Sequence, residues 1–177
     1  MEHLPPFKSL FSAPFNFQTY FLAMGFVMHV LAFSVENQRY AVELSYVYKV
    51  LSAVAISPLP DSPAFVAGLV NVHGKLLPVA NLRQKFNLPT VELALQHRFL
   101  WVNTSEREWL LWVDSVEGVQ LYPLEQQVLA VTLPQPTTQL KAMIALADGV
   151  MLIQDLSSLL TAAEQEVLDN ALHHSSG

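Results

Sequence analysis

The residue types that could carry chemistry in this 177-residue chain are scattered along it. No two of the six histidines stand four residues apart, the spacing with which a helix presents two imidazoles to zinc. His173 and His174 are adjacent, but a chain end lacks the second layer of hydrogen bonds that fixes metal ligands, so we expect no metal site. The chain has no cysteine, which excludes disulfides, thiolate nucleophiles and cysteine-based metal centres.

Asp114 is the carboxylate best placed for acid–base chemistry. It follows the apolar run 110–113 and could act as a catalytic acid with a raised pKa. The simpler interpretation is an acid at a strand end that accepts backbone N–H groups in the next turn. We favour that structural role, because no second carboxylate or nucleophile lies nearby to complete a catalytic pair.

Motifs of the common enzyme classes are also absent. The chain has no dinucleotide fingerprint, phosphate-binding loop, nucleophile elbow or HExxH zinc motif. Its six glycines are too few for a glycine-rich phosphate cradle. We therefore predict a protein that is not an enzyme and needs no cofactor.

Four aromatic residues gather in the middle of the chain: Phe99, Trp101, Trp109 and Trp112. Exposed, they would form a stacking platform for bases or sugars, or line the pocket of a small-molecule-binding β-barrel. A nucleic-acid-binding surface would also need a stripe of Lys and Arg, and none accompanies them. We expect these residues in the core or at a protein interface and keep the small-molecule barrel as an alternative.

Composition indicates a folded domain. Hydrophobic residues make up 52% of the chain and charged residues 14%, the opposite of a disordered chain. The net charge of −6 is uneven. Residues 1–98 carry seven Lys or Arg and five Asp or Glu (+2), and residues 99–177 carry two and ten (−8). The acidic half suits a basic protein partner or solubility.

From His29 onward the pattern is of short strands divided by turns. The expected strands are 29–35, 39–44, 53–57, two within 68–82, 98–103, 108–116, 118–122 and two within 140–155. Because of Pro78, its strand should lie at a sheet edge or carry a bulge itself. Asp148 and Gly149 predict a type I′ turn. This pattern indicates an all-β fold of small barrels.

Two helical segments complete the expected elements. Residues 81–89 predict one helical turn that ends before Pro89. A capping box of Thr161 and Glu164 begins a C-terminal helix. The residues that share its apolar face are Val167, Leu168, Ala171 and Leu172.

Three regions are expected: an apolar N-terminal extension (1–27), a β domain (28–172) and a disordered tail (173–177). The apolar run 20–33 is shorter than the roughly 20 residues that span a membrane. Glu2 stands where a secretory signal would be basic. Met24 and Met28 leave open an internal start, and an interfacial segment or an anchor remain alternatives.

The segment 63–86 resembles the signature of the CheW-like coupling proteins of bacterial chemotaxis. The family pattern is a proline, an aromatic, a glycine, an apolar-Asn-apolar-Arg-Gly turn, then Pro-Val/Ile and Asp-Leu-Arg. The matching residues here are Pro63, Phe65, Gly68, Asn71, Gly74, Pro78, Val79, Leu82, Arg83 and Phe86. Residues 33–44, 108–119 and 145–160 resemble further family segments in the same order, so the resemblance covers about residues 29–172.

This resemblance implies two five-stranded, SH3-like β-barrels packed on a shared core, with a C-terminal helix. It implies a non-enzymatic adaptor that docks on the regulatory domain of a CheA-type histidine kinase and engages the cytoplasmic tip of chemoreceptors. The protein would be cytoplasmic and associated with the inner face of the membrane through receptor arrays. The alternative within this fold is a scaffold for another pathway, such as twitching motility or second-messenger control.

The resemblance also implies the partner-binding residues: Val47, Lys49, Gly68, His73, Gly74, Val116 and Val119. The three valines match family contact positions, although each also suits a strand core. Gly68 and Gly74 suit special backbone geometry, with a positive φ expected at Gly74.

Three positions depart from the family pattern. His73 replaces an arginine, so a permanent charge becomes a mostly neutral imidazole. Asn81 replaces an aspartate and keeps its shape without its charge. Lys49 replaces a glutamate and reverses its sign. We hypothesise that the partner surface has changed with them.

Overall fold

The computed structural model describes residues 27–124, 127–129 and 139–175. Its strands, whose side chains point alternately to the two faces, form two sheets. Most of the expected N-terminal extension and much of the segment after Pro123 lie outside these residues. The described strands are β1 (Val27–Val35), β2 (Gln38–Glu43), β3 (Val47–Ser52), β4 (Val66–Val72), β5 (Lys75–Asn81), β6 (Arg98–Asn103), β7 (Glu108–Val113), β8 (Ser115–Pro123), β9 (Gln127–Leu129), β10 (Leu140–Leu146) and β11 (Gly149–Gln154).

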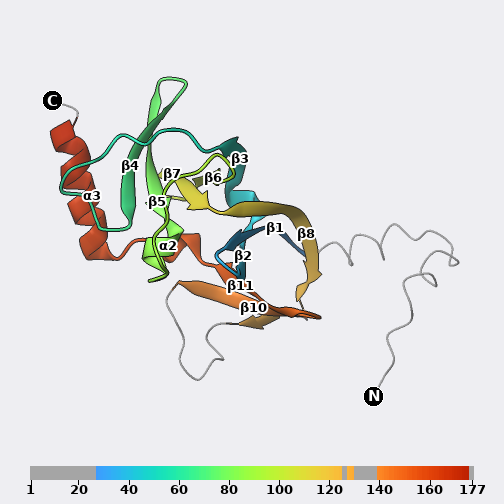
Figure 1. Cartoon of the computed structure of the whole chain (residues 1–177). Helices are drawn as coiled ribbons and strands as arrows, with labels where there is room; N and C mark the ends of the chain where they lie inside the picture. The colour runs from blue at the N-terminus through green and yellow to red at the C-terminus, as the bar shows by residue number, and fades with distance from the viewer. Residues whose placement is uncertain (1–26, 125–126, 130–138, 176–177) are drawn as a thin grey trace, which may run out of the picture.

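The strands form one sheet in each half of the molecule (Figure 1). The first sheet has the order β8-β1-β2-β11-β10-β9, and the second has the order β3-β6-β7-β5-β4. The second sheet is made from one continuous stretch of chain, 47–113. The first sheet takes strands from both sides of that stretch and joins them through parallel pairing of β2 with β11.

Each sheet surrounds its own apolar cluster. Val30 and Ala32 of β1 join Ile144 and Met151 in the cluster of the first sheet. Phe99 of β6 lies in the cluster of the second sheet. We call the two units barrel 1 and barrel 2. The remaining residues of these clusters are Ala41, Ala142, Ile153, Val70, Leu77, Val79, Leu110 and Trp112.

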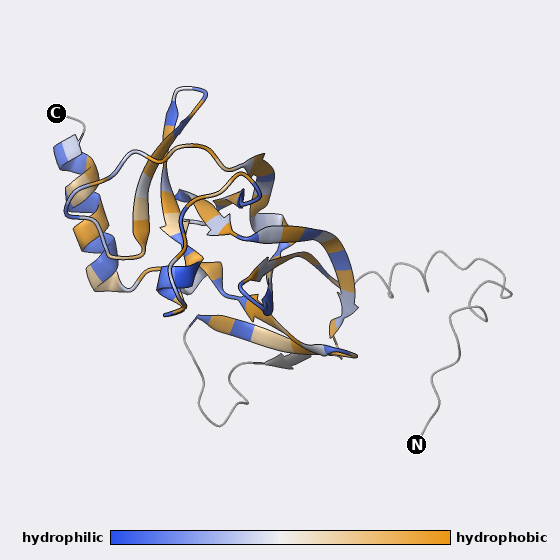
Figure 2. Ribbon diagram, viewed as in Figure 1, coloured by the Kyte–Doolittle hydropathy of each residue, from blue (hydrophilic) through white to orange (hydrophobic). Residues whose placement is uncertain are grey.

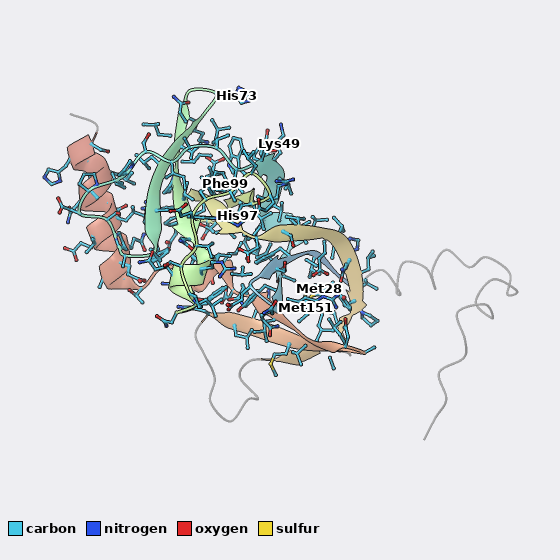
Figure 3. The ribbon with its side chains drawn as sticks, in the orientation of Figure 1. Met28, Lys49, His73, His97, Phe99 and Met151 are labelled. Carbon is cyan, nitrogen blue, oxygen red and sulfur yellow. The ribbon has the colours of Figure 1, made fainter. Side chains whose placement is uncertain are left out.

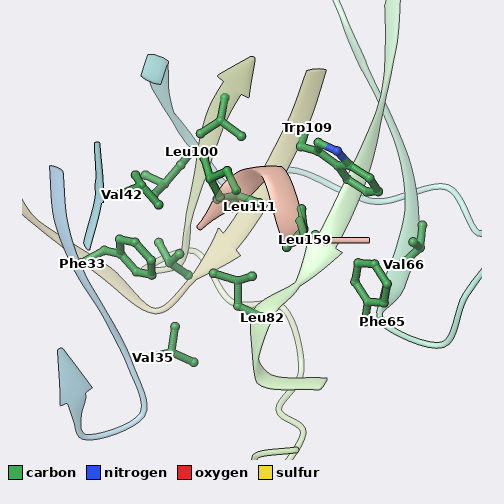
Figure 4. Close-up of a cluster of buried hydrophobic side chains, with 14 of the residues drawn as sticks. Phe33, Val35, Val42, Phe65, Val66, Leu82, Leu100, Trp109, Leu111 and Leu159 are labelled. Carbon is green, nitrogen blue, oxygen red and sulfur yellow. The ribbon is translucent and has the colours of Figure 1, made fainter. Parts of the chain in front are cut away.

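A third and larger cluster joins the two barrels (Figure 4). Because successive side chains of a strand point to opposite faces, Phe33 faces the shared core while Ala32 faces the interior of barrel 1. In the same way, Leu100 faces the shared core while Phe99 faces the interior of barrel 2. Burial on both faces explains why β1 and β6 are almost uniformly apolar (Figure 2).

These clusters confirm the expected fold class, two small barrels that share a core. One detail differs, since the sheet of barrel 1 has six strands. The extra member is β9, a three-residue strand that pairs with the outer side of β10.

The three expected hairpins are present. They join β1 to β2, β4 to β5 and β10 to β11. The type I′ turn predicted for the last one is wrong, because among its residues only Gly149 has a positive φ, at 151°, and Asp148 does not. A type I′ turn needs positive φ at both central residues.

Two expectations for barrel 2 are corrected. Residues 53–57 form no strand and make a single bridge, from Ser57 to Leu69. Pro78 lies in β5, an interior strand between β7 and β4, and the irregular register is on the neighbouring strand β4, between Val66 and Gly68. The interior position is tolerated because the pairing of β5 with β7 begins only at Val79, after the proline.

The expected helical turn is α2 (Leu82–Lys85), and Asn81 begins it by accepting a hydrogen bond from the Gln84 N–H at 3.3 Å. Short 3-10 turns also follow β2 (η2, Leu44–Tyr46) and β11 (η5, Leu156–Ser158). No helix in the described part of the chain is long and apolar enough to cross a membrane.

The C-terminal helix, α3 (Ala162–Ser175), begins at the expected capping box. The Glu164 carboxylate also accepts hydrogen bonds from Lys85 of α2 at 3.0 and 3.1 Å, and Arg107 pairs with Asp169. Two ion pairs therefore fasten α3 to barrel 2. Its apolar face is narrower than expected, because Leu168 is fully buried whereas Val167 is 44% exposed. The helix includes His173 and His174 in its last turn.

Candidate protein-binding surfaces

The geometry of Asp114 is that of a structural ion pair. Its carboxylate accepts hydrogen bonds from Arg83 Nε at 3.1 Å and Nη2 at 2.5 Å, and from the Glu36 backbone N–H at 2.7 Å. Burial alone would raise the pKa of Asp114, but the Arg83 and Glu36 hydrogen bonds and nearby positive charge together hold that pKa below its usual value. The carboxylate is thus kept ionised, which is unsuited to a catalytic acid and suited to joining α2 to the β1–β2 turn.

The tryptophans belong mainly to the core. Trp109 is 1% exposed and packs with Phe65 in the shared core, and Trp112 is 8% exposed inside barrel 2. Trp101 is only partly buried, at the margin of the same barrel-2 cluster. Side chains that fill the core cannot line a ligand cavity, so the small-molecule-binding barrel is not favoured. Among the described residues no group of three or more His, Asp or Glu could hold a metal ion.

Gly68 is required by the fold. It is buried in β4 with φ of 143°, and a Cβ placed on it would stand 2.1 Å from the backbone oxygen of Ser57. The Ser57–Leu69 bridge brings that backbone close, with N–O distances of 2.8 and 2.9 Å. Because Gly68 is buried, its role in the structure is to allow this close backbone approach and not to make a direct surface contact.

His73 and Gly74 form the exposed tip of the β4–β5 hairpin, which projects at one end of barrel 2 (Figure 3). Their φ angles are 52° and 88°, as expected for Gly74 and uncommon for a histidine. The Asn71 side-chain oxygen accepts the Gly74 N–H at 2.7 Å and fixes the turn. The family arginine position is therefore held on a rigid, exposed turn.

A row of contacts crosses four strands at this end of barrel 2. Tyr48 of β3 lies against Trp101 of β6 with ring centroids 4.8 Å apart. Trp101 Nε1 donates to Glu108 Oε1 of β7 at 3.3 Å, and Glu108 pairs with Lys75 of β5. We call these four residues the barrel-end row.

Three of the candidate residues found in the sequence lie at the two ends of this row. Lys75 is paired in register with Val72, next to the His73–Gly74 turn. At the other end, Lys49 is exposed and stands opposite Trp101 in the β3–β6 ladder. Figure 3 shows Lys49 and His73 toward the same end of the molecule. The structure thus gathers Lys49, His73 and Gly74 around one face.

The three valines lie elsewhere. Val47 and Val116 are partly buried against the shared core. Val119 lies on β8 of barrel 1, 52% exposed, and shares its strand face with Leu121, which is 59% exposed. Apart from Gly68, which is buried in β4, the candidate residues therefore divide between the end of barrel 2, the junction of the barrels and the outer face of β8.

Sequence analysis missed Tyr48. It is 72% exposed, and it is the extra residue at a bulge in β3 between Val47 and Lys49. A bulge turns a side chain away from the regular strand face, so the alternating pattern of a strand does not apply to it. In the sequence, the only indication that Tyr48 is exposed was its position next to Lys49, where the family pattern has the opposite charge.

Asn81 proves to be structural. It is 7% exposed, and its side chain caps α2 while its backbone N–H donates to Phe65 O at 2.8 Å. Asparagine fills the capping position as well as aspartate does. Of the three departures from the family pattern, only Lys49 and His73 change an exposed surface.

Comparison with known proteins identifies the family. The family model described as a CheW-like domain matches residues 29–164 of this chain. The chain belongs to the CheW-like family. A protein of Klebsiella aerogenes named Chemotaxis protein CheW is 26% identical over 144 residues, which cover 79% of this chain and 86% of that protein. The protein of the same name from Thermotoga maritima is 30% identical over 90 residues, which cover 51% of this chain and 59% of that protein.

A solved CheW structure has the same fold. The crystal structure of the scaffolding protein TtCheW from Thermoanaerobacter tengcongensis superposes with a TM-score of 0.70 at 22% identity, covering 77% of this chain and 94% of that one. CheW-like proteins are non-enzymatic scaffold adaptors. Membership therefore confirms the two-barrel CheW-like fold and the expectation that this chain is an adaptor and not an enzyme.

Proposed function

We propose that this CheW-like adaptor couples a CheA-type histidine kinase to chemoreceptors by docking on the regulatory domain of the kinase and on the cytoplasmic tip of the receptors. The match of the family model over residues 29–164 carries the proposal. The working location would be the cytoplasmic face of the membrane, within receptor arrays, and the adaptor domain would be residues 28–172.

The described surface suits docking between proteins. Exposed apolar side chains occur on both barrels, with Tyr48 on β3, Leu76 on β5 and Leu121 on β8 more than half exposed. The strands that carry them have buried apolar side chains in the clusters beneath. Protein interfaces are built in this way, from apolar and aromatic contacts with a polar rim.

Calorimetric titration tests the kinase half. The full chain would be titrated with the regulatory domain of the CheA-type kinase from the same organism, and we expect a dissociation constant in the micromolar range, about −8 kcal/mol of binding free energy. A protein that is folded by circular dichroism and does not bind would overturn kinase docking.

Co-sedimentation tests the receptor half. Membranes that contain the chemoreceptors of the same organism would be pelleted with the purified chain, with receptor-free membranes as the control. Recovery of the chain only with receptor membranes supports coupling. Equal recovery from both preparations contradicts it.

A further inference from the structure

We propose that residues 90–94 form a proton-sensitive strap over barrel 2, which neutral His97 holds closed and which protonation of His97 Nδ1 releases. The strap belongs to the irregular connection between α2 and β6. When the strap is released, its apolar side chain Leu93 leaves the cluster of barrel 2. The inference concerns the fold itself and holds whichever partners the adaptor binds.

The strap is attached at both ends. At its start, Arg83 Nη1 of α2 donates to the carbonyl oxygen of Pro89 at 3.0 Å. At its end, His97 binds both polar backbone groups of Ala94. The Ala94 N–H donates to His97 Nδ1, and the Ala94 carbonyl accepts the His97 N–H, each at 3.0 Å. Between the two ends Leu93 is partly buried against the barrel-2 cluster, while the residues before it are exposed.

The hydrogen bond from Ala94 specifies the protonation state of His97. An N–H donor at 3.0 Å needs a lone pair on Nδ1, which the neutral imidazole has and the imidazolium lacks. A proton on Nδ1 would make two donors face each other, so either Ala94 or the imidazole would have to move. The closed strap is therefore compatible only with neutral His97.

Packing around His97 indicates that the strap, and not the imidazole, would move. His97 is only 6% exposed, and its ring lies against that of Trp112, with ring centroids 5.7 Å apart. The buried Trp112 Nε1 has no hydrogen-bond partner within the described part of the chain, so acceptors are already scarce beside His97. Because the strap is largely exposed, its displacement disturbs less packing than displacement of the two buried rings.

On the elements next to His97, the charges that bear on its protonation oppose one another. They belong to Asp114 at the β7–β8 junction, Arg83 on α2, Arg98 on β6 and the exposed Glu92 on the strap. Asp114 is close enough for its charge to interact with that of His97, but its carboxylate is already paired with Arg83. The Arg98 guanidinium donates to the His97 carbonyl oxygen at 2.7 Å and adds a cation. We therefore expect the conflict with the Ala94 N–H to decide whether the strap stays closed.

Amide hydrogen exchange followed by NMR tests the strap in the full chain. The exchange rate of the Ala94 N–H, divided into its intrinsic rate at each pH, gives a protection factor. Histidine side chains change charge between about pH 5 and 8, and a closed strap that excludes the proton must open as the pH falls. From about pH 7.5 to about pH 5 we expect the Ala94 protection factor to fall by about tenfold or more.

The turn after β6 supplies an internal control. There the Arg107 N–H donates to Thr104 Oγ1 at 3.2 Å, and a hydroxyl acceptor does not titrate in this pH range. The Arg107 protection factor should change by less than about twofold. Over the same range the lowered pKa of Asp114 keeps its pair with Arg83 ionised.

Matched variants assign the effect to His97. In His97→Asn, Oδ1 takes the place of Nδ1 as an acceptor that does not titrate, so the Ala94 protection factor should no longer depend on pH. In His97→Phe a ring remains against Trp112 but the acceptor is lost, so Ala94 should be unprotected at both pH values. His29→Asn, at an exposed position on β1, should behave as the native chain does.

A fall at Ala94 alone, abolished by His97→Asn, supports the strap. An Ala94 protection factor that does not change with pH overturns it, and so does an equal fall at Ala94 and Arg107, which would mean that the whole barrel loosens. A fall that persists in His97→Asn would assign the response to another group and also overturn the inference. The native chain with its Arg107 control decides the question even where a variant does not fold.

Discussion

At Gly68, space and backbone conformation act together. Its φ of 143° is unfavourable for any side chain, and its missing Cβ leaves room for the Ser57 backbone. We expect Gly68→Ala to destabilise the protein by more than about 3 kcal/mol, because backbone atoms would have to move. Urea denaturation monitored by circular dichroism would measure the loss.

Gly118 supplies the control for Gly68. Its φ is 113°, but a Cβ there would meet nothing within 4 Å. Gly118→Ala should cost only the strain of the backbone, about 1–2 kcal/mol. Equal losses for the two variants would show that conformation alone, and not the approach of Ser57, makes Gly68 necessary.

Asp114 gives a second prediction for a single residue. Replacing it with asparagine leaves the largely buried Arg83 guanidinium without its charged partner. We expect Asp114→Asn to lower the free energy of unfolding by about 1–3 kcal/mol. Asp61→Asn should change the free energy of unfolding by less than about 0.5 kcal/mol, because Asp61 is exposed and takes part in none of the ion pairs found among the described residues. If both variants lost the same amount, the ion pair would contribute nothing specific.

Among the elements, α3 is held by a narrow apolar contact and two ion pairs. Leu168 is fully buried in the shared core, so Leu168→Ala should cost about 2–4 kcal/mol through the cavity that it leaves. Val167→Ala, one position earlier and 44% exposed, should cost less than about 1 kcal/mol. Thermal unfolding of the two variants measures the difference. A smaller effect at Leu168 would mean that the helix is not part of the cooperative core.

Most elements of the fold could be predicted from local pattern. Hairpins with clear turn residues, the capping box and the helical turn before Pro89 depend on neighbouring residues, and each is present. Residues 53–57 were misassigned because β-branched and small residues look alike in a strand and in an extended loop. The type of the β10–β11 turn was missed because a turn sequence permits more than one set of backbone angles.

The site was less accessible to sequence reasoning than the fold. The turn residues His73 and Gly74 follow from one motif, and their positive φ angles bear out the turn. Tyr48 joins Trp101, Glu108 and Lys75 only because four strands meet in a particular register. That register depends on packing across distant segments, which no local pattern contains.

For the molecule as a whole, acid should weaken the two ion pairs that α2 makes, Arg83 with Asp114 and Lys85 with Glu164. The pKa of Glu164 is lowered: burial alone would raise it, and hydrogen bonds from Thr161 and Lys85 outweigh that effect. The pKa of Asp114 is lowered in a similar way through Arg83. Carboxylates whose pKa is lower in the folded state stabilise the fold above their unfolded pKa, and that stability is lost as the pH falls through the folded pKa.

Stability should therefore be nearly constant with respect to these two groups at neutral pH and fall below about pH 5. The double variant Asp114→Asn with Glu164→Gln should be less stable at pH 7 but should lose less on acidification. Urea titrations at several pH values would compare how steeply the free energy of unfolding falls with pH in the native chain and in the double variant. Parallel slopes would show that other carboxylates control the acid response.

The nested order of the strands has a consequence for the synthesis of the protein. Residues 47–113 contain every strand of barrel 2, so this barrel can assemble as soon as that stretch leaves the ribosome. Barrel 1 must wait, because β2 acquires its neighbour β11 only near the end of translation. Until then β1 and β2 keep apolar side chains without partners. The partly synthesised chain is therefore the form most prone to aggregation. Barrel 2 is already folded when β10 and β11 arrive to complete barrel 1.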